Sequence, residues 1–438
     1  MAPGNFQVVK VNTLARLASG NFFAKGGIMA ALFALHLTAA RSGDWPQWLG
    51  PKRDGHASAA ADINRLPADL KPLWKKEIGG GFSSPIVQGE KVVYLDDFQG
   101  KETVHVLETA DGRELWSRVL DESYADEWGS GPRSTPFADG DRLYVQSCRG
   151  EFRCLQFSDG RTLWRVNFEK DFGVPFLGSK ANEGTASRRG NNGSGLVDRD
   201  QVVIPVGSTN GASLVSFDKR TGIQRWESLS DEAAYSSLIA ANVQGQAQII
   251  AFTADALVGV DSDNGKDLWR VPFKTNAKRH AATPVVVGDL VIVNSHTIGL
   301  VATRIQKKGE RFETKEAWAN RALKINLATP VAADGYLFCQ GPNKNYICVD
   351  AASGKEVWSQ PGFGKEFSAT IAVGKRLLVL SDAGELFLIA ADPKKYSELG
   401  RAQVSGRTWS SPAFADGKLF VREGLLNGWK LSCFNLAP

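Results

Sequence analysis

One short hairpin motif recurs along the chain and constrains its fold more than any other feature. In Asn345–Trp358, a β-prone strand is followed by a tight turn ending in glycine, and the next strand carries a tryptophan four residues after that glycine. Glycine suits the left-handed backbone that hairpin loops of about three to five residues require. The same pattern, with the same four-residue step, occurs in Val106–Trp116, Cys154–Trp164, Ser216–Trp226 and Gly259–Trp269. The chain is therefore built from an internal repeat.

The spacing of the tryptophans sets the size of the repeating unit. Trp74, Trp116, Trp164, Trp226, Trp269, Trp318 and Trp358 are separated by 42, 48, 62, 43, 49 and 40 residues, and Leu399 fills the same position 41 residues further on. A period in the forties with several strands per unit is typical of propeller blades. Each indole can bury about 150–250 Å² between neighbouring blades. Because a tryptophan recurs once per repeat at one position, its role is interpreted as packing.

A second landmark marks the start of each unit, and the two ends of the chain predict how the units close. Pairs of small residues precede a strand–turn–strand pattern at or near Ser83, Ser134, Ser194, Ser236, Ala282, Ala328, Ser368 and Ser410. Leu70–Ile78 reads as an outer strand with no unit before it, and Ser410–Phe434 as a unit with no outer strand after it. If the first strand completes the last unit, a closed ring leaves no exposed sheet edge.

These observations predict an all-β fold, an eight-bladed β-propeller of four-stranded antiparallel blades. The propeller is expected over residues 70–438, with the ring closed by an N-terminal outer strand. Seven blades are the alternative if the weakly matching third or fifth unit is not a blade.

Residues 1–40 have the features of a signal peptide. The first 25 residues carry only positive charges, and Gly26–Leu37 is mostly apolar but short for a membrane span. Thr38-Ala39-Ala40 then offers small residues at the −3 and −1 positions of a cleavage site. We therefore expect an exported protein, periplasmic or secreted, without a membrane span in the mature chain. An uncleaved anchor is the alternative.

Residues 41–69 and the charge balance complete the domain picture. The segment is rich in Gly, Pro and Asp, but Trp45 and Trp48 are too apolar to be left in water. We expect it to be an extended segment packed on the propeller. The net charge is +5, and three of those charges come from residues 1–40, which contain no acid, so the mature chain is close to neutral. This balance argues against a nucleic-acid partner.

Residues 44–436 resemble exported bacterial proteins built from pyrroloquinoline-quinone-like (PQQ-like) β-propeller repeats. The resemblance rests on the repeat, on the opening DWPQWLGPKRDG, on GPRSTP at Gly131–Pro136 and on WSSPAFADGKLFVRE at Trp409–Glu423. It implies one of two groups. One contains quinoprotein dehydrogenases that use PQQ and calcium. The other contains non-enzymatic propellers, including a lipid-anchored subunit of the outer-membrane protein assembly machinery.

The residues favour the second group. Quinoprotein alcohol dehydrogenases typically carry two adjacent cysteines, which this chain lacks. Asp261–Asp267 resembles the start of a calcium loop, but proline at position 272 stands where the closing glutamate would be. The five histidines show no metal-ligand spacing, and Ser216–Lys219, a nucleophile-like SxxK, lies in a repeat turn. We expect no catalytic residues, no metal site and no cofactor, with PQQ plus calcium as the alternative. A Cys339–Cys348 disulfide is left open.

One set of residues predicts a binding surface. The position two places before each unit's start should enter the central channel, and it is occupied by Phe82, Arg133, Asn192, Tyr235, Ala281, Leu327, Phe367 and Trp409. Phe82, Arg133, Tyr235, Phe367 and Trp409 are the predicted ligand contacts, with Arg133 binding an anionic group through two hydrogen bonds. The alternative is that the aromatic residues merely plug the channel.

The charges of the connecting loops extend this prediction. Acids precede units two and four (Asp121, Glu122, Asp126, Glu127, Asp231, Glu232), and bases precede units five, six and eight (Lys274, Lys278, Arg279, Arg321, Lys324, Arg401, Arg407). The sequence therefore predicts a non-catalytic exported scaffold that binds a protein, peptide or glycan, with an anionic ligand preferred. A PQQ-dependent dehydrogenase is the alternative function.

Overall fold

The structure is a computed structural model that describes residues 43–58, 63–178, 189–275, 278–424 and 428–437. All of them belong to one compact unit, Thr38–Pro438. The predicted signal peptide, residues 1–40, lies outside the described residues. No helix in the described ranges is both long and apolar enough to cross a membrane.

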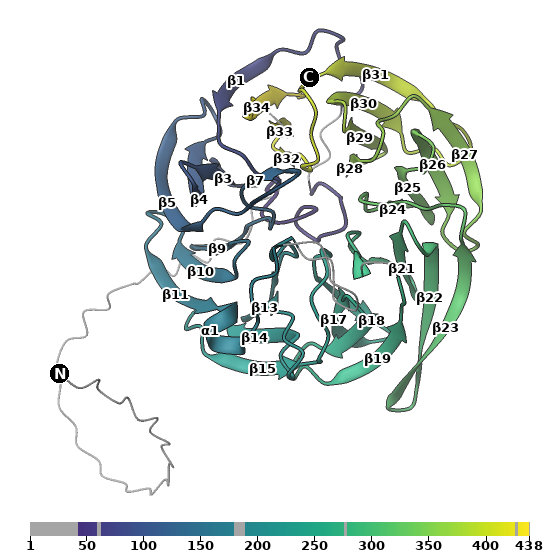
Figure 1. The fold of residues 1–438 in the computed structure, drawn as a ribbon. Helices are drawn as coiled ribbons and strands as arrows, with labels where there is room; N and C mark the ends of the chain where they lie inside the picture. Colours follow the sequence, from purple (N-terminus) through teal and green to yellow (C-terminus); the bar gives the residue numbers. More distant parts are fainter. Residues whose placement is uncertain (1–42, 59–62, 179–188, 276–277, 425–427, 438) are drawn as a thin grey trace, which may run out of the picture. The chain divides into compact units, whose positions relative to one another are not determined.

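Eight four-stranded antiparallel sheets follow one another around a central axis, as Figure 1 shows. The first blade comprises β2 (Ile86–Gln88), β3 (Lys91–Phe98), β4 (Lys101–Glu108) and β5 (Glu114–Glu122), and the second comprises β8 (Phe137–Asp139), β9 (Arg142–Gln146), β10 (Glu151–Gln156) and β11 (Thr162–Asn167). The third comprises β12 (Leu196–Asp198), β13 (Gln201–Pro205), β14 (Leu214–Asp218) and β15 (Gln224–Ser228), and the fourth comprises β16 (Ile239–Val243), β17 (Gln246–Phe252), β18 (Ala256–Asp261) and β19 (Asp267–Pro272).

The remaining blades repeat this arrangement. The fifth comprises β20 (Val285–Val287), β21 (Leu290–Ser295), β22 (Gly299–Lys308) and β23 (Arg311–Asn320), and the sixth comprises β24 (Val331–Ala333), β25 (Tyr336–Gln340), β26 (Asn345–Asp350) and β27 (Glu356–Pro361). The seventh comprises β28 (Ser368–Val373), β29 (Arg376–Ser381), β30 (Glu385–Ala390) and β31 (Glu398–Gln403). Between the first two blades lies a two-stranded hairpin, β6 (Ala125–Asp126) and β7 (Gly129–Ser130), and the described α-helix, α1 (Phe168–Phe172), follows β11.

The eighth blade joins the two ends of the chain. It contains β32 (Ala413–Ala415), β33 (Lys418–Glu423), β34 (Lys430–Asn435) and β1 (Pro72–Glu77), in the order β1-β34-β33-β32. β1 pairs antiparallel with β34, with Trp74 opposite Cys433 and Glu77 opposite Lys430. The predicted eight-bladed propeller and its closure by an N-terminal outer strand are thus confirmed, and the seven-bladed alternative is wrong.

Each repeat tryptophan links its own blade to the next one. Trp74 packs on the turn glycine Gly112 of the first blade, where an added Cβ would lie 2.8 Å from the ring, and its indole N–H donates to Thr109 O at 3.0 Å. The same step joins Trp116 to Gly160, Trp164 to Gly222, Trp226 to Gly265 and Trp318 to Gly354. Within one hairpin, the glycine therefore contacts the tryptophan of the preceding blade, and the tryptophan contacts the turn glycine of the following blade.

The residue opposite each tryptophan is mostly small. Cys154, Ser216, Gly259 and Cys348 pair with the tryptophans of their own blades, and the register shifts directly after each pair. A small side chain at this position leaves room for the indole to lean toward the next blade. Cores between adjacent blades then form from both neighbours; one of them combines Phe137, Tyr144 and Phe152 of the second blade with Val202 and Ile204 of the third.

The register also shows whether Cys339 and Cys348 can form a disulfide. Cys339 pairs with Ile347 and Phe338 with Cys348, so the two cysteines face opposite sides of the sixth blade, and all five cysteines are free. The Cys339–Cys348 disulfide is therefore wrong.

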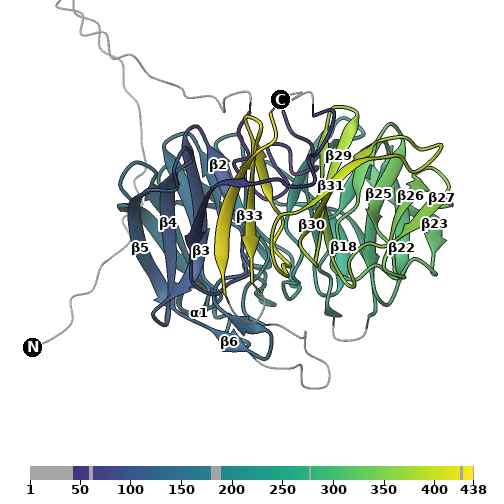
Figure 2. The same cartoon turned by 90° about the horizontal axis from the view of Figure 1, so that it is seen from above.

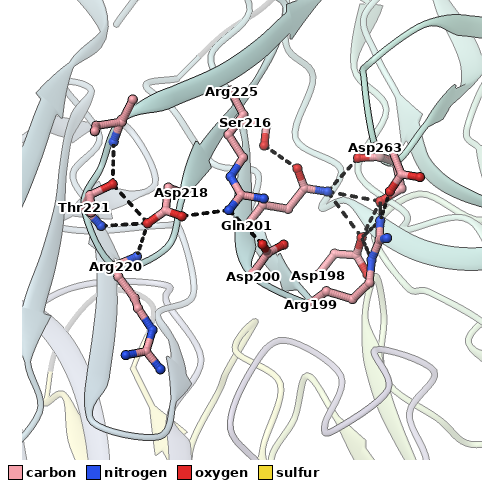
Figure 3. A network of polar contacts seen from close by, with 12 residues as sticks. Asp198, Arg199, Asp200, Gln201, Ser216, Asp218, Arg220, Thr221, Arg225 and Asp263 are labelled. Carbon is pink, nitrogen blue, oxygen red and sulfur yellow. Dashed lines mark hydrogen bonds and ion pairs between the residues drawn. The ribbon is translucent and has the colours of Figure 1, made fainter. Parts of the chain in front are cut away.

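Ser216 and Lys219 do not form a dyad. Ser216 donates its hydroxyl proton to Gln201 at 2.5 Å in the polar network of Figure 3, whereas the ammonium of Lys219 pairs with Asp139 at 2.6 Å. Ser216 thus forms a hydrogen bond within the third blade, and Lys219 links the third blade to the second.

The segment 43–58 crosses the centre of the ring, where Figure 1 draws it in purple. Trp45 is buried and exchanges backbone hydrogen bonds with Val87 of the first blade. The buried guanidinium of Arg53 donates to Ser194 O and Gly195 O next to the third blade, and Ala57 donates to Ala372 O of the seventh. One end of the channel is therefore covered by the chain's own N-terminal segment.

Candidate functional site: a pocket at the channel mouth

A pocket of about 420 Å³ lies where the inner strands begin. Its lining includes all eight positions that the repeat alignment placed at the channel entrance: Phe82, Arg133, Asn192, Tyr235, Ala281, Leu327, Phe367 and Trp409. Each precedes the inner strand of a different blade, so residues far apart in sequence converge on one axis. Ligand binding by Phe82, Arg133, Tyr235, Phe367 and Trp409 stays a prediction.

The pocket opens on the side of the ring away from the N-terminal segment. That segment contacts the inner strands at their far ends, for example at Val87 and Ala372, whereas the pocket residues precede these strands. Figure 2 shows β6, which belongs to the pocket side, at the opposite edge of the ring from the purple segment. Trp48, which belongs to the N-terminal segment, lines the covered end of the pocket, and its indole N–H donates to Thr283 Oγ1 at 2.9 Å. The pocket therefore has one open end and one covered end.

Aromatic side chains form one wall. The rings of Trp409 and Trp128 lie 5.3 Å apart, Trp409 and Phe82 lie 6.3 Å apart, and Phe82 meets Trp429 edge-on at 5.7 Å. Trp128 is 45% exposed, which leaves much of its surface free for another apolar group. It lies in the β6–β7 hairpin, and sequence reasoning missed it because it falls in a connection between blades. Its position outside the 40-residue spacing was the available signal.

Arg133 is held in place by its neighbours. Its guanidinium pairs with Asp126 at 2.8 Å and lies between the rings of Phe82 and Tyr124, 5.0 and 5.2 Å from their centres. Asp126 also pairs with Arg189 at 3.2 Å. The guanidinium is therefore already engaged within the protein, and the expected contact of Arg133 with a ligand through two hydrogen bonds stays a prediction.

The pKa of Asp126 reflects these contacts. Burial favours the protonated form, but the hydrogen bonds from Arg133, from the Trp128 backbone and from Arg189 outweigh it. The pKa of the carboxyl group is therefore held below its usual range, and Asp126 is an anion at neutral pH. Arg189 pairs in addition with Glu127, so two acids balance two of the pocket's arginines.

Arg279 is the pocket arginine whose charge is not neutralised by an ion pair with a described acid. Its guanidinium makes no ion pair or hydrogen bond with any described residue, and its Nε is buried without a partner. Burial raises the pKa of the Tyr235 phenol, and the positive charges of all three pocket arginines oppose that rise. Arg279 also lowers the pKa of His296, behind the larger effect of burial. Its positive charge therefore acts inside the pocket.

Other polar atoms of the lining are likewise unsatisfied. Among the described residues, Asn192 Oδ1 and Trp409 Nε1 have no hydrogen-bond partner although both are buried. A buried polar atom without a partner costs about 1–3 kcal/mol unless a ligand or water satisfies it. Both atoms lie below the surface of the lining, so the unpaired group that the pocket offers to an occupant is the cation of Arg279.

Local ion pairs cancel much of the charge asymmetry expected from the loops. Lys278 pairs with Asp255 at 2.7 Å, Arg321 with Glu316 at 3.1 Å and Arg401 with Glu398 at 2.6 Å. On the acidic side, Asp231 pairs with Arg270 at 2.7 Å. The predicted opposition between acidic and basic loops is therefore weaker than the sequence indicated, and the charge of the pocket itself matters more.

The lining does not fit a calcium site. Calcium takes about six to eight oxygen ligands, largely from carboxylates. Among the described residues that line the pocket, Glu366 is the one carboxylate and three are arginines. The carboxylate of Asp261, in the loop that resembled a calcium site, accepts hydrogen bonds from Asp263 N and Asn264 N of its own turn. In the part of the chain that the structure describes, no group of three His, Cys, Asp or Glu is placed to hold a metal.

Comparisons with known proteins agree with the propeller fold and identify the family of this chain. A family model described as outer membrane protein assembly factor BamB matches residues 100–360 and 343–432. The outer membrane protein assembly factor BamB of Burkholderia pseudomallei is 21% identical over 320 residues, which are 69% of this chain and 74% of that protein.

Two solved structures show how widely the fold is shared. BamB from Moraxella catarrhalis superimposes with a TM-score of 0.54 at 13% identity and covers 85% of this chain and 95% of its own. A quinohemoprotein alcohol dehydrogenase from Pseudomonas putida superimposes with a TM-score of 0.61 at 12% identity, covering 90% and 80%. Because both identities are low, these similarities establish the propeller and leave the activity to the site.

Proposed function

Because this chain belongs to the family described as outer membrane protein assembly factor BamB, we propose that it is a non-catalytic, exported propeller that binds a protein partner in the bacterial envelope. The proposal includes a cleaved signal within residues 1–40 and a periplasmic or secreted mature chain without a bound cofactor. A peptide segment of the partner is the expected ligand, and a glycan is the remaining alternative.

The pocket at the channel mouth is the observation that carries this proposal. Its described lining consists of aromatic rings, arginines, aliphatic and neutral polar side chains and the carboxylate of Glu366, and none of these residues is a histidine or a cysteine. Such a lining can hold a ligand by stacking and charge, but it offers no pair of groups suited to proton transfer or nucleophilic attack. At about 420 Å³ the pocket is large enough for a few residues of a partner and far too small for a folded domain.

A PQQ-dependent dehydrogenase is the alternative that shares the fold. The three arginines suit an anionic cofactor, but calcium would have to bind beside them, with Glu366 as the one carboxylate among the described lining residues. Like charges close to a cation site disfavour binding. The binding role is therefore preferred.

Deletion of the gene in a bacterium that carries this chain tests the proposal. The deletion should lower the amount of folded outer-membrane protein in the envelope, and expression of the wild-type chain should restore it. A deletion strain with unchanged outer-membrane proteins would contradict a role in their assembly. The same purified chain, given PQQ and calcium, should reduce no dye with alcohols or sugars; saturable turnover would favour the alternative.

A further inference from the structure

The covered end of the pocket restricts what can enter it. Trp48 lines the pocket from the N-terminal segment and is tied to Thr283 by its indole N–H at 2.9 Å. The same segment is fixed on other sides of the ring by Trp45 at Val87 and by Arg53 at Ser194. A polypeptide that enters at the mouth therefore cannot pass through the channel. A pocket closed behind its lining accepts the end of a chain more readily than an internal stretch.

The unpaired cation of Arg279 matches the end of a polypeptide. Arg279 carries a positive charge with no counter-ion among the described residues, and a terminal carboxylate supplies one. An internal acidic side chain carries the same charge but has polypeptide on both sides of it, whereas a chain end fits a pocket that is closed behind its lining.

The aromatic wall adds a preference for the last side chain. Trp128 is 45% exposed and lies 5.3 Å from Trp409, so an apolar side chain placed against it removes apolar surface from water. Asp126 and Glu127 neutralise Arg133 and Arg189, so a ligand with one negative charge suits the pocket better than a polyanion.

We propose that this pocket binds the C-terminal end of an extended polypeptide, with the terminal carboxylate at Arg279 and an apolar last side chain against Trp128 and Trp409. This inference rests on the proposed binding function and names the ligand class for its site. Arg133 is a positioning residue in this account, because its guanidinium is held by Asp126 and by two aromatic rings.

Fluorescence anisotropy of the purified chain with a fluorescein-labelled glycine–serine peptide ending in leucine tests the proposal. The peptide with a free carboxylate should bind roughly ten-fold or more tightly than the same peptide with a C-terminal amide, since a charged hydrogen bond is lost. Arg279→Gln should weaken the acid peptide by a similar factor and leave the amide peptide unchanged. With the wild-type protein, a peptide that ends in serine and has a free carboxylate should bind more weakly than the corresponding peptide that ends in leucine.

Arg220→Gln is the matched control. Arg220 lies in an exposed turn of the third blade, and Figure 3 shows its side chain directed away from the polar network there. The control removes the same charge from the protein, so an equal loss of binding in both variants would indicate unspecific attraction and overturn the proposal. Circular dichroism and thermal melts of both variants show that the fold is kept.

The other possible results of these experiments also test the proposal. Equal binding of acid and amide peptides, or unchanged binding by Arg279→Gln, would overturn the proposal. Competition by free isovalerate as effective as the unlabelled peptide would identify a small-acid site and overturn it as well. If peptides fail to bind but the deletion strain still lacks folded outer-membrane protein, then the ligand class is wrong and the proposed function stands.

Discussion

The indole of Trp74, in the first strand of the propeller, covers Gly112 in the turn between β4 and β5 of the first blade, with a hydrogen bond of 3.0 Å to Thr109 O. Trp74 belongs to the eighth blade through the β1–β34 pairing, so this contact crosses the junction at which the ring closes. The same contact recurs between Trp116 and Gly160, which explains why glycine and tryptophan keep a fixed spacing in sequence.

The first prediction concerns this closure contact. Trp74→Ala should lower the free energy of unfolding by about 3–5 kcal/mol, because it removes a large ring from between two blades. Gly112→Ala should also destabilise, since its φ is +73° and a Cβ would lie 2.8 Å from the indole. Gly89→Ala is the matched control: its φ is +58°, but nothing lies within 4 Å of the added carbon. Denaturant melts in which Gly112→Ala costs no more than Gly89→Ala would contradict the contact.

The second prediction concerns a buried acid. Glu102 accepts a hydrogen bond from Cys148 N at 3.0 Å, and its other oxygen has no partner among the described residues. Burial raises the pKa of this carboxyl group to about 8 from an ordinary value of 4.5. Between these values the unfolded chain loses the proton and the folded chain keeps it, so stability should fall as the pH rises from about 4.5 to about 8.

The variant Glu102→Gln isolates this effect. The amide keeps an acceptor for Cys148 N and cannot ionise, so at pH 8 the variant should be more stable than the wild type by about 2 kcal/mol or more. At pH 4.5 the two proteins should be nearly equal. Unfolding free energies measured at both pH values check this, and a difference that does not change with pH would show that Glu102 is ionised in the fold.

The third prediction separates the roles of Arg133 and Trp409. Arg133→Ala should lower stability by about 1–3 kcal/mol, because Asp126 keeps Arg189 but loses its 2.8 Å partner. Trp409→Ala should weaken ligand binding by at least about 1 kcal/mol with a smaller effect on stability, since one face of the ring borders the pocket. Melts and binding curves on the same two variants test this. If Trp409→Ala only lowers the melting temperature, then the ring is a channel plug.

The fourth prediction concerns the cofactor. Addition of PQQ with calcium to the purified chain should leave the absorbance of the quinone unchanged, because Glu366 is the one carboxylate that the described lining offers to calcium. Addition of calcium alone should not change the melting temperature. A calcium-dependent spectral shift would restore the dehydrogenase alternative.

Much of the fold followed from the sequence because the repeat records contacts between blades. The spacing of the seven tryptophans from Trp74 to Trp358, continued by Leu399, predicted eight blades, and the unpaired strand Leu70–Ile78 predicted the closure. The alignment of the units also placed Phe82 and Trp409 at one mouth, since equivalent positions of a closed ring must face one axis.

The partners of individual side chains could not be obtained in this way. The β6–β7 hairpin lies outside the repeat, so its placement of Asp126 beside Arg133 and of Trp128 beside Trp409 has no counterpart in other units. Arg279 was one of seven bases in the loops, and its place in the pocket lining distinguishes it from bases such as Lys278, which pairs with Asp255. The Cys339–Cys348 hypothesis was wrong because a one-residue difference in register places two side chains on opposite faces.

Photo-crosslinking in living cells tests most directly whether the channel mouth binds a protein. A photo-reactive amino acid at position 128, where Trp128 is 45% exposed at the pocket, should form a discrete adduct with an envelope protein, and Arg279→Gln should abolish it. The same amino acid at position 223, where Ile223 is 68% exposed in an outer turn of the third blade, should form none. Adducts of equal yield from both positions, or none from position 128, would contradict a partner-binding site at this mouth.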